Sequence, residues 1–237
     1  MTTDTTEKGL ETLIVRHMTG TDGLAVPPNS VARPPTPYGG TGYTAGNPLD
    51  YDRAHALDVP QLFAFLRATQ PEAFKKLAMV DSNDAKDINR LKFLARLSGE
   101  IGKRGAIDVL RKGVEHGPVH FDLFYGTPSL GNAKAEALHA QNRFAITRQL
   151  AYSMDETRRA LGLCLFINGL PIATFELKNS LTKQTVEDAP LAPWQERARF
   201  PVGFLRGLHR RTQSGRQARP GTTRWARARR AMSIGWS

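Results

Sequence analysis

Cysteine is almost absent from this chain of 237 residues. Cys164 is the only one, so no disulfide can form within the chain, and its apolar neighbours predict a buried small side chain rather than a nucleophile. No apolar run approaches the ~20 residues that span a membrane. The N-terminal segment also lacks the basic and apolar parts of a signal peptide. We therefore expect a cytoplasmic protein that makes no membrane contact.

Two common ligand-binding patterns are also missing. The chain has no G-x-x-x-x-G-K-[ST] loop, whose backbone amides hold the phosphates of ATP, so we expect no ATP site of the common kind. His116 and His120 have the spacing of metal ligands on a helix, but Gly117 and Pro118 would interrupt that helix. Structural roles are therefore favoured for both histidines.

Lysine is missing from residues 190–237, where arginine is abundant. This segment has eleven Arg and one acid, Glu196, and it accounts for +10 of the net charge of +11. It shows no sustained helical or strand period. One interpretation is a shifted reading frame in a GC-rich gene; the other is a tail whose Arg and Trp side chains bind nucleic acid. Either way, we expect a domain over 1–189 and an irregular basic tail over 190–237.

The patterns within residues 1–189 predict an α/β fold, a mixed sheet of four or five strands flanked by helices. Helical spacing is visible over residues 9–18, with Leu10, Leu13 and Ile14 on the apolar face, and over 59–80 and 85–112. Residues 19–50, rich in Gly, Pro and Thr, predict a loop. The predicted strands are an edge strand over 121–125, a strand over 142–152 and a hairpin within 161–177.

The hairpin ends in an unusual charged pair. Glu176 and Lys178 follow an apolar run and are two residues apart, so they share a face of the strand. Such a pair is either an exposed ion pair or part of a site. A three-residue turn over 167–169 would place Gly162 on the same face, whereas a two-residue turn would place it on the opposite face. The sequence leaves the turn open.

The block Asn168-Gly169-Leu170-Pro171, followed by Glu176-Leu177-Lys178, resembles the N-terminal nuclease domain of type I restriction enzyme R subunits (HsdR). The resemblance implies a restriction-endonuclease-like fold with a PD-(D/E)xK site, which cleaves double-stranded DNA with Mg²⁺. It also implies assembly with M and S subunits, the S subunit choosing the DNA sequence. By the same resemblance, Glu176 and the Leu177 carbonyl hold the metal, and Lys178 assists the attacking water.

The sequence departs from the family pattern at several points. Gly162 stands where the family has its first metal-binding Asp, and Asp155 or Glu156 are poorly placed to substitute. The family's Gln-and-Tyr helix and its ATP-driven motor have no counterpart in this sequence. We therefore expect a truncated chain with impaired cleavage; the alternative is an inactive remnant or a DNA-binding module that acts through the Arg-rich tail.

A few further residues match the family. Arg143, Arg148 and Gln149 lie in an element similar to the family's N-R-F…Q strand, which implies DNA contacts, with solvent exposure of the two Arg as an equal alternative. Glu11 matches a Glu on the family's first helix. We interpret Glu11 as a solvated helix residue.

Overall fold

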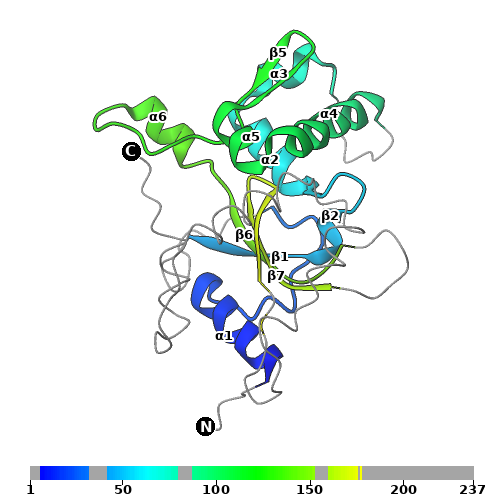
Figure 1. The fold of residues 1–237 in the computed structure, drawn as a ribbon. Coiled ribbons are helices and arrows are strands. Elements are labelled where there is room, and N and C mark those ends of the chain that lie inside the picture. The colour runs from blue at the N-terminus through cyan, green and yellow to red at the C-terminus, as the bar shows by residue number, and fades with distance from the viewer. Residues whose placement is uncertain (1–5, 32–41, 80–86, 153–159, 176, 178–237) are drawn as a thin grey trace, which may run out of the picture.

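A four-stranded sheet forms the centre of the computed structural model, which describes residues 6–31, 42–79, 87–152, 160–175 and 177 (Figure 1). The strand order is β1-β6-β7-β8; β1 runs parallel to β6, and the other pairs are antiparallel. The strands are β1 (Tyr43–Gly46), β6 (Phe144–Ala151), β7 (Ala160–Ile167) and β8 (Leu170–Phe175). The expected α/β fold, with a mixed sheet and flanking helices, is confirmed.

Helices and short strands surround this sheet. The helices are α1 (Glu7–Thr19), η1 (Pro48–Asp50), α2 (Val59–Thr69), α3 (Pro71–Lys76), α4 (Ile88–Arg104), α5 (Ala106–Lys112) and α6 (Ala133–His139). Two small antiparallel pairs complete the described part of the chain, β2 (Tyr51–Asp52) with β3 (Leu57–Asp58), and β4 (Val114–His116) with β5 (Val119–Phe121).

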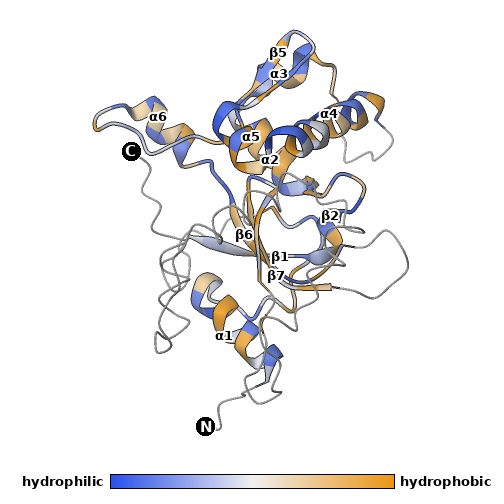
Figure 2. Cartoon of the chain, in the orientation of Figure 1, coloured by the Kyte–Doolittle hydropathy of each residue, from blue (hydrophilic) through white to orange (hydrophobic). Residues whose placement is uncertain are grey.

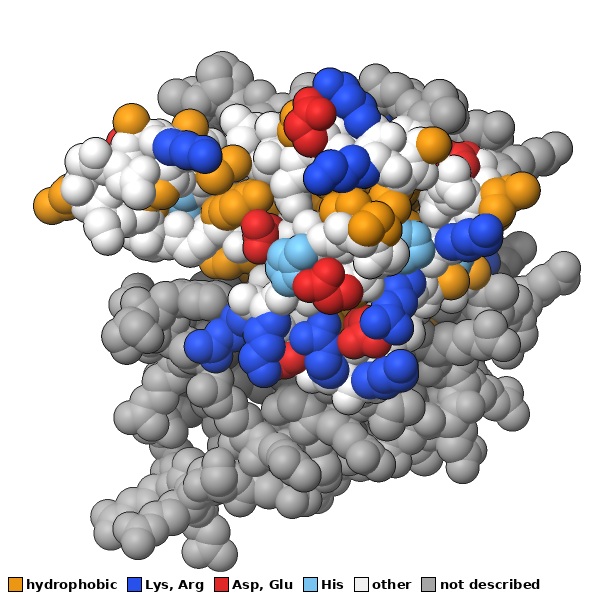
Figure 3. Space-filling model, turned by 90° about the horizontal axis from the view of Figure 1, so that it is seen from above, with side chains coloured by type: hydrophobic (Ala, Val, Ile, Leu, Met, Phe, Trp, Pro, Cys, Tyr) orange, Lys and Arg blue, Asp and Glu red, His pale blue; other side chains and the backbone are white. Residues whose placement is uncertain are grey.

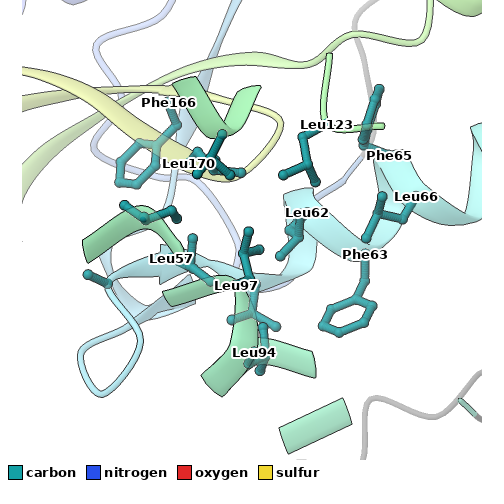
Figure 4. Close-up of a cluster of buried hydrophobic side chains, with 14 of the residues drawn as sticks. Leu57, Leu62, Phe63, Phe65, Leu66, Leu94, Leu97, Leu123, Phe166 and Leu170 are labelled. Carbon is teal, nitrogen blue, oxygen red and sulfur yellow. The ribbon is translucent and has the colours of Figure 1, made fainter. Parts of the chain in front are cut away.

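The two faces of the sheet are covered from different parts of the chain. Helix α1 lies on one side, where Val15 and Met18 pack against Ile146 of β6 and Leu163 of β7 (Figure 1). Helices α2, α4 and α5 lie on the other side and enclose the larger core. Figure 4 shows this core between α2, α4 and the β7–β8 hairpin. Burying each large apolar side chain contributes roughly 1.5–3 kcal/mol, so both faces stabilise the sheet.

Two long predicted helices are each divided in the structure. Within the predicted stretch 59–80, the described residues form α2 and α3, because Pro71 has no backbone N–H and therefore begins a helix instead of continuing one. Within the predicted stretch 85–112, the described residues form α4 and α5, separated by Gly105 with φ 85°. Helical content was predicted correctly, but the breaks were not.

Two strand and loop predictions were wrong in detail. Within the predicted loop over 19–50, Tyr43–Gly46 forms β1 and pairs with β6, about a hundred residues later in the sequence. This segment has no alternating pattern of its own, so only the long-range pairing identifies it as a strand. The predicted edge strand over 121–125 ends at Phe121 and begins at Val119, where it pairs with β4.

The buried face of α1 differs from the predicted one. Leu13 is 51 % exposed, while Glu11, Val15 and Met18 are buried. These three positions follow the i, i+4, i+7 spacing of one helix face. Figure 2 shows how apolar and polar residues divide along this helix. The Glu is therefore the one polar residue of that trio, and it faces the sheet.

The residues singled out for metal or nucleophilic chemistry lie in the core or in a surface hairpin. Cys164 is fully buried in β7, and burial raises the pKa of its thiol, as expected for a packed side chain. His120 bonds Glu115 across the β4–β5 hairpin at 2.7 Å, and the His116 ring meets the edge of Phe93. In the described part of the chain, no helix is long and apolar enough to cross a membrane.

The outer surface of the helical layer carries charges of both signs. Figure 3 shows acidic side chains among the basic ones on this side of the molecule. On α4 and α5, Glu100 pairs with Arg96 and Arg104, and Asp108 pairs with Arg104 and Lys112. Each exposed pair contributes about 0.3–0.5 kcal/mol. The surface of α4 and α5 is therefore mixed in charge.

Candidate functional site

The β7–β8 hairpin combines a tight turn with a bulge. Asn168 and Gly169 form a two-residue turn with φ 49° and 82°, the positive values of a type I′ turn. The register then shifts by one residue: Phe166 pairs with Pro171, but Leu165 pairs with Ala173. The bulge adds one residue to β8. Below it, the residues of β7 and β8 that share a face of the sheet are those that a three-residue turn would have placed together. Of the two alternatives, the two-residue turn is therefore the one observed, but the bulge reverses the face that this turn alone would have given to Gly162.

Asn168 fixes this hairpin to the rest of the domain. Its buried side chain donates to the Leu123 carbonyl at 2.9 Å and to Asn142 Oδ1 at 3.0 Å, and it accepts from the Arg143 amide at 2.6 Å. At Gly169, an added Cβ would lie 2.4 Å from the Asp58 carbonyl oxygen. The N-G-L-P block thus has a structural explanation, because it locks the hairpin that presents the strand ends.

Strand β6 is distorted beside the end of β7. Gln149 has φ 48°, an uncommon value for a residue with a side chain, and the ladder between β6 and β7 omits Gln149 and Gly162. The distortion lets two consecutive side chains, Arg148 and Gln149, both reach α1. Local backbone strain of this kind is concentrated at functional sites in proteins, which makes this end of the sheet a candidate.

Glu11 lies at the centre of this region. Gln149 Nε2 lies 2.9 Å from each of its carboxylate oxygens, and Arg148 Nη2 lies 3.5 Å from Oε2. The Glu11 residue is only 4 % exposed. The interpretation of Glu11 as a solvated residue was therefore wrong. The i, i+4, i+7 spacing of Glu11 with Val15 and Met18 is the sequence signal that could have placed it on the buried face.

The Glu11 carboxylate adjoins the position where the family's Asp is missing. A Cβ built on Gly162 would lie 3.0 Å from Glu11 Oε1 and 3.0 Å from the Phe175 carbonyl oxygen. Any side chain at position 162 would thus project toward these two oxygens. The structure therefore brings a helix carboxylate and a strand-end carbonyl to the place where the resemblance expects metal chemistry.

The other predicted site residues are placed as follows. Glu176 and Lys178 lie outside the described residues, as do Asp155 and Glu156. Leu177 is half-buried and packs against the apolar cluster under α1. The expected metal ligands on the strand therefore stay predictions.

The two arginines do not behave alike. Arg148 is 6 % exposed, so the alternative that it faces solvent was wrong; its Nη1 donates to the Asp22 carbonyl at 2.7 Å. Arg143 is half-buried, and its guanidinium donates to the carbonyl of Val31 and to Gln61. Gln149 is exposed. DNA contact by these three residues stays a prediction, and the geometry gives Arg148 and Gln149 contacts to Glu11.

The oxygen atoms at this place suit a hard divalent cation. Mg²⁺ prefers carboxylate and carbonyl oxygens, and Glu11 and Phe175 offer one of each. Within the described ranges, no group of three or more His, Cys, Asp and Glu side chains is gathered as a complete metal site. These residues can therefore contribute to a magnesium site, and Glu176 follows directly after Phe175 in the sequence.

By its fold and its candidate site, the protein is a mixed α/β domain. Its sheet has a buried carboxylate beside a strand end with a strained backbone. Comparison with protein families then gives a match over residues 101–190, to the family described as Type I restriction enzyme R protein N terminus. The match supports an HsdR N-terminal domain, and this domain suggests the nuclease region of an R subunit. It extends from the end of α4 through β8, and α1 lies outside it. Searches among curated proteins and solved structures gave no match.

Proposed function

We propose that this chain provides the nuclease region of a type I restriction enzyme R subunit and cleaves double-stranded DNA with Mg²⁺. The observation that carries the proposal is the Glu11 carboxylate beside Gly162, at the end of a hairpin that falls within the family match. The mixed sheet with helices on both faces is compatible with a restriction-endonuclease-like fold. Cleavage is slower than in family members that carry an Asp on the strand.

The residues that act in this proposal come from two sources. Glu176 and the Leu177 carbonyl would hold Mg²⁺, and Lys178 would orient the attacking water, all three carried over from the family pattern. Once bound, the metal would polarise the scissile phosphate and make water more acidic. Losing one metal-ligand carboxylate lowers the rate by roughly a thousandfold, a few kcal/mol of transition-state stabilisation.

Partners follow from the same proposal. DNA is the substrate, and M and S subunits bind the chain and direct it to a sequence. Translocation on DNA would depend on an ATP-driven motor, and the chain has no Walker-type phosphate loop.

A plasmid-cleavage assay tests the proposal. The wild-type chain is compared with Glu176→Ala and Lys178→Ala, each with Mg²⁺ and with EDTA. We expect slow, Mg²⁺-dependent nicking that both substitutions abolish. The glycine at position 162 favours a second candidate, a DNA-binding remnant without catalysis. Retarded migration of DNA without cleavage by any version would support that candidate and contradict the first.

A further inference from the structure

We propose that helices α4 and α5 form a surface that binds the phosphate backbone of duplex DNA, apart from the strand end where cleavage is proposed. This surface goes beyond the proposed function, because binding there needs no metal. It lies on the opposite side of the sheet from α1 and Glu11 (Figure 1). The DNA contact would therefore be separate from the place of cleavage.

Positive charge within residues 1–189 is concentrated on these two helices. Residues 88–112, which include α4 and α5, contain seven Arg and Lys and two acids, a net charge of +5. The other residues of 1–189 contain fifteen Arg and Lys and nineteen acids, a net charge of −4. Positive charge that gathers along a helix of an otherwise acidic domain is typical of a surface that binds nucleic acid.

The basic side chains of α4 form a stripe on its outer face. Lys92, Arg96 and Lys103 are exposed, and their spacing of four and seven residues places them on one side of the helix. From Lys92 to Lys103 the stripe is roughly 16 Å long. Figure 3 shows basic side chains gathered on this side of the molecule. Since duplex DNA carries one charge per about 1.7 Å of its axis, the stripe can face several phosphates.

Glu100 holds part of this stripe in place. Its carboxylate lies 3.3 Å from Arg96 Nη1, 3.6 Å from Lys103 Nζ and 2.9 Å from Arg104 Nε. The Glu100 side chain is 13 % exposed and that of Lys103 is 70 % exposed, so the carboxylate lies beneath the cations. The neighbouring acid of α5 also pairs with two cations, so the group keeps a net positive charge. Side chains that are already held in place lose less conformational entropy when they bind a phosphate.

The outer face of α4 suits a phosphate backbone better than a protein partner. Beside the basic stripe, its exposed positions Ala95, Gly99 and Gly102 have a small side chain or none. The large apolar residues that α4 exposes, Ile88 and Leu91, are confined to its first turn. Most of the face therefore allows close approach of a phosphate chain and lacks the large anchors typical of protein interfaces. The choice of duplex DNA as the polyanion rests on the proposed function.

The salt dependence of DNA binding tests this surface. Fluorescence anisotropy of the full chain with a labelled duplex compares the wild type with Lys103→Gln and with the double variant Lys92→Gln, Lys103→Gln. We expect the slope of log K against log salt to become shallower by about 0.9 in the single variant and about 1.8 in the double variant, since each phosphate contact contributes about 0.9. The matched control is Lys134→Gln, at an exposed lysine of α6, which should leave the slope unchanged. A slope that Lys103→Gln leaves unchanged, or that Lys134→Gln reduces equally, would overturn the inference.

Acetylation of lysines in the wild-type chain, read by mass spectrometry, is a second measurement that needs no substitution. Duplex DNA should protect Lys92 and Lys103 and leave Lys134 reactive. Equal reactivity of Lys103 with and without DNA would refute the surface. Protection by poly-glutamate but not by DNA would also refute it and would indicate an acidic protein partner instead.

The same footprint with Glu176→Ala separates this inference from the proposed nuclease. We expect Glu176→Ala to abolish plasmid cleavage and to keep the protection of Lys103. Protection of Lys103 without cleavage by the wild type would support the surface and contradict the nuclease. Cleavage without that protection would contradict the surface and leave the nuclease intact. Loss of protection in Glu176→Ala would assign the DNA contact to the strand end and refute a separate surface.

Discussion

Gly169 shows how closely a single backbone position can be determined. It has φ 82°, and a Cβ there would lie 2.4 Å from the Asp58 carbonyl oxygen and 2.7 Å from atoms of Leu62. Both the left-handed conformation and the close approach of a second segment require glycine here. The hairpin turn is thus also the contact that joins the sheet to the start of α2.

Replacement of Gly169 by Ala should therefore be more damaging than an equivalent change elsewhere. Gly131 is the matched control, with φ 83° and nothing within 4 Å of an added Cβ. We expect Gly131→Ala to cost about 1 kcal/mol from backbone strain alone, and Gly169→Ala about 3 kcal/mol because the overlap adds to the strain. Urea unfolding measures both, and equal costs would contradict the close approach.

Asp58 is a second residue whose environment has measurable consequences. It caps α2 by accepting from the Gln61 amide, and it is 2 % exposed. Burial, reinforced by the nearby charge of Asp50, raises the pKa of its carboxyl to about 7, although Arg143 and the Gln61 amide act in the other direction. The folded state therefore holds a proton that the unfolded state releases near pH 4.

The raised pKa of Asp58 predicts how the stability of the protein changes with pH. Between pH 4 and pH 7 the folded state binds more protons at Asp58 than the unfolded state does, so its contribution to stability falls as the pH rises. From pH 5 to pH 8 the loss should be about 3 kcal/mol relative to Asp58→Asn, which keeps the cap. Urea unfolding of both proteins at the two pH values measures this difference. Parallel pH curves would contradict the prediction.

At the scale of elements, Gly105 decides that α4 and α5 are two helices. Its φ 85° and ψ 153° lie in a region that residues with side chains rarely adopt. The amphipathic pattern runs through this position without a break, so apolar spacing alone predicts one helix. Because the chain changes direction at this break, α5 places Val109 and Leu110 in the larger core, on the α2–α4 side of the sheet.

Two substitutions in this region should have opposite effects on the stability of the protein. Gly99→Ala, inside α4 with nothing within 4 Å of an added Cβ, should stabilise the protein by about 0.5–1 kcal/mol. Gly105→Ala should destabilise it by about 2 kcal/mol, since the backbone conformation is strained for alanine. Thermal unfolding followed by circular dichroism reports both. A stabilised Gly105→Ala variant would mean that α4 and α5 can join.

The hairpin β7–β8 shows why local patterns fail to fix a register. Its strands and its turn residues were predicted, and both are present. The bulge was not predicted, because an apolar run with few polar positions gives no alternation that could show a one-residue shift. Its consequence is large, since it decides which residues of the two strands face each other beside Gly162.

At the scale of the whole molecule, the charge is divided unevenly. Residues 190–237 hold +10 of the net +11. A strongly basic segment neutralises phosphates and releases counterions, whatever its conformation. Binding of the chain to DNA should therefore weaken steeply as salt increases.

A chain that ends at Ala189 provides the comparison. Fluorescence anisotropy with labelled duplex DNA should show weaker binding for this shortened chain and a smaller slope of log K against log salt. An unchanged slope would assign the phosphate contacts to residues 1–189, whose net charge is close to zero.

The composition and local patterns of this sequence determined its α/β class, most of its helices, the β6 strand and the β7–β8 hairpin. These depend on neighbouring residues along the chain, so the sequence can show them directly. The pairing of β1 with β6, the bulge and the burial of Glu11 depend on segments far apart in the sequence. Only the tertiary structure decided these. The pairing and the bulge depend on contacts between distant segments, and the spacing of Glu11 with Val15 and Met18 indicates a shared helix face but not that the sheet covers it.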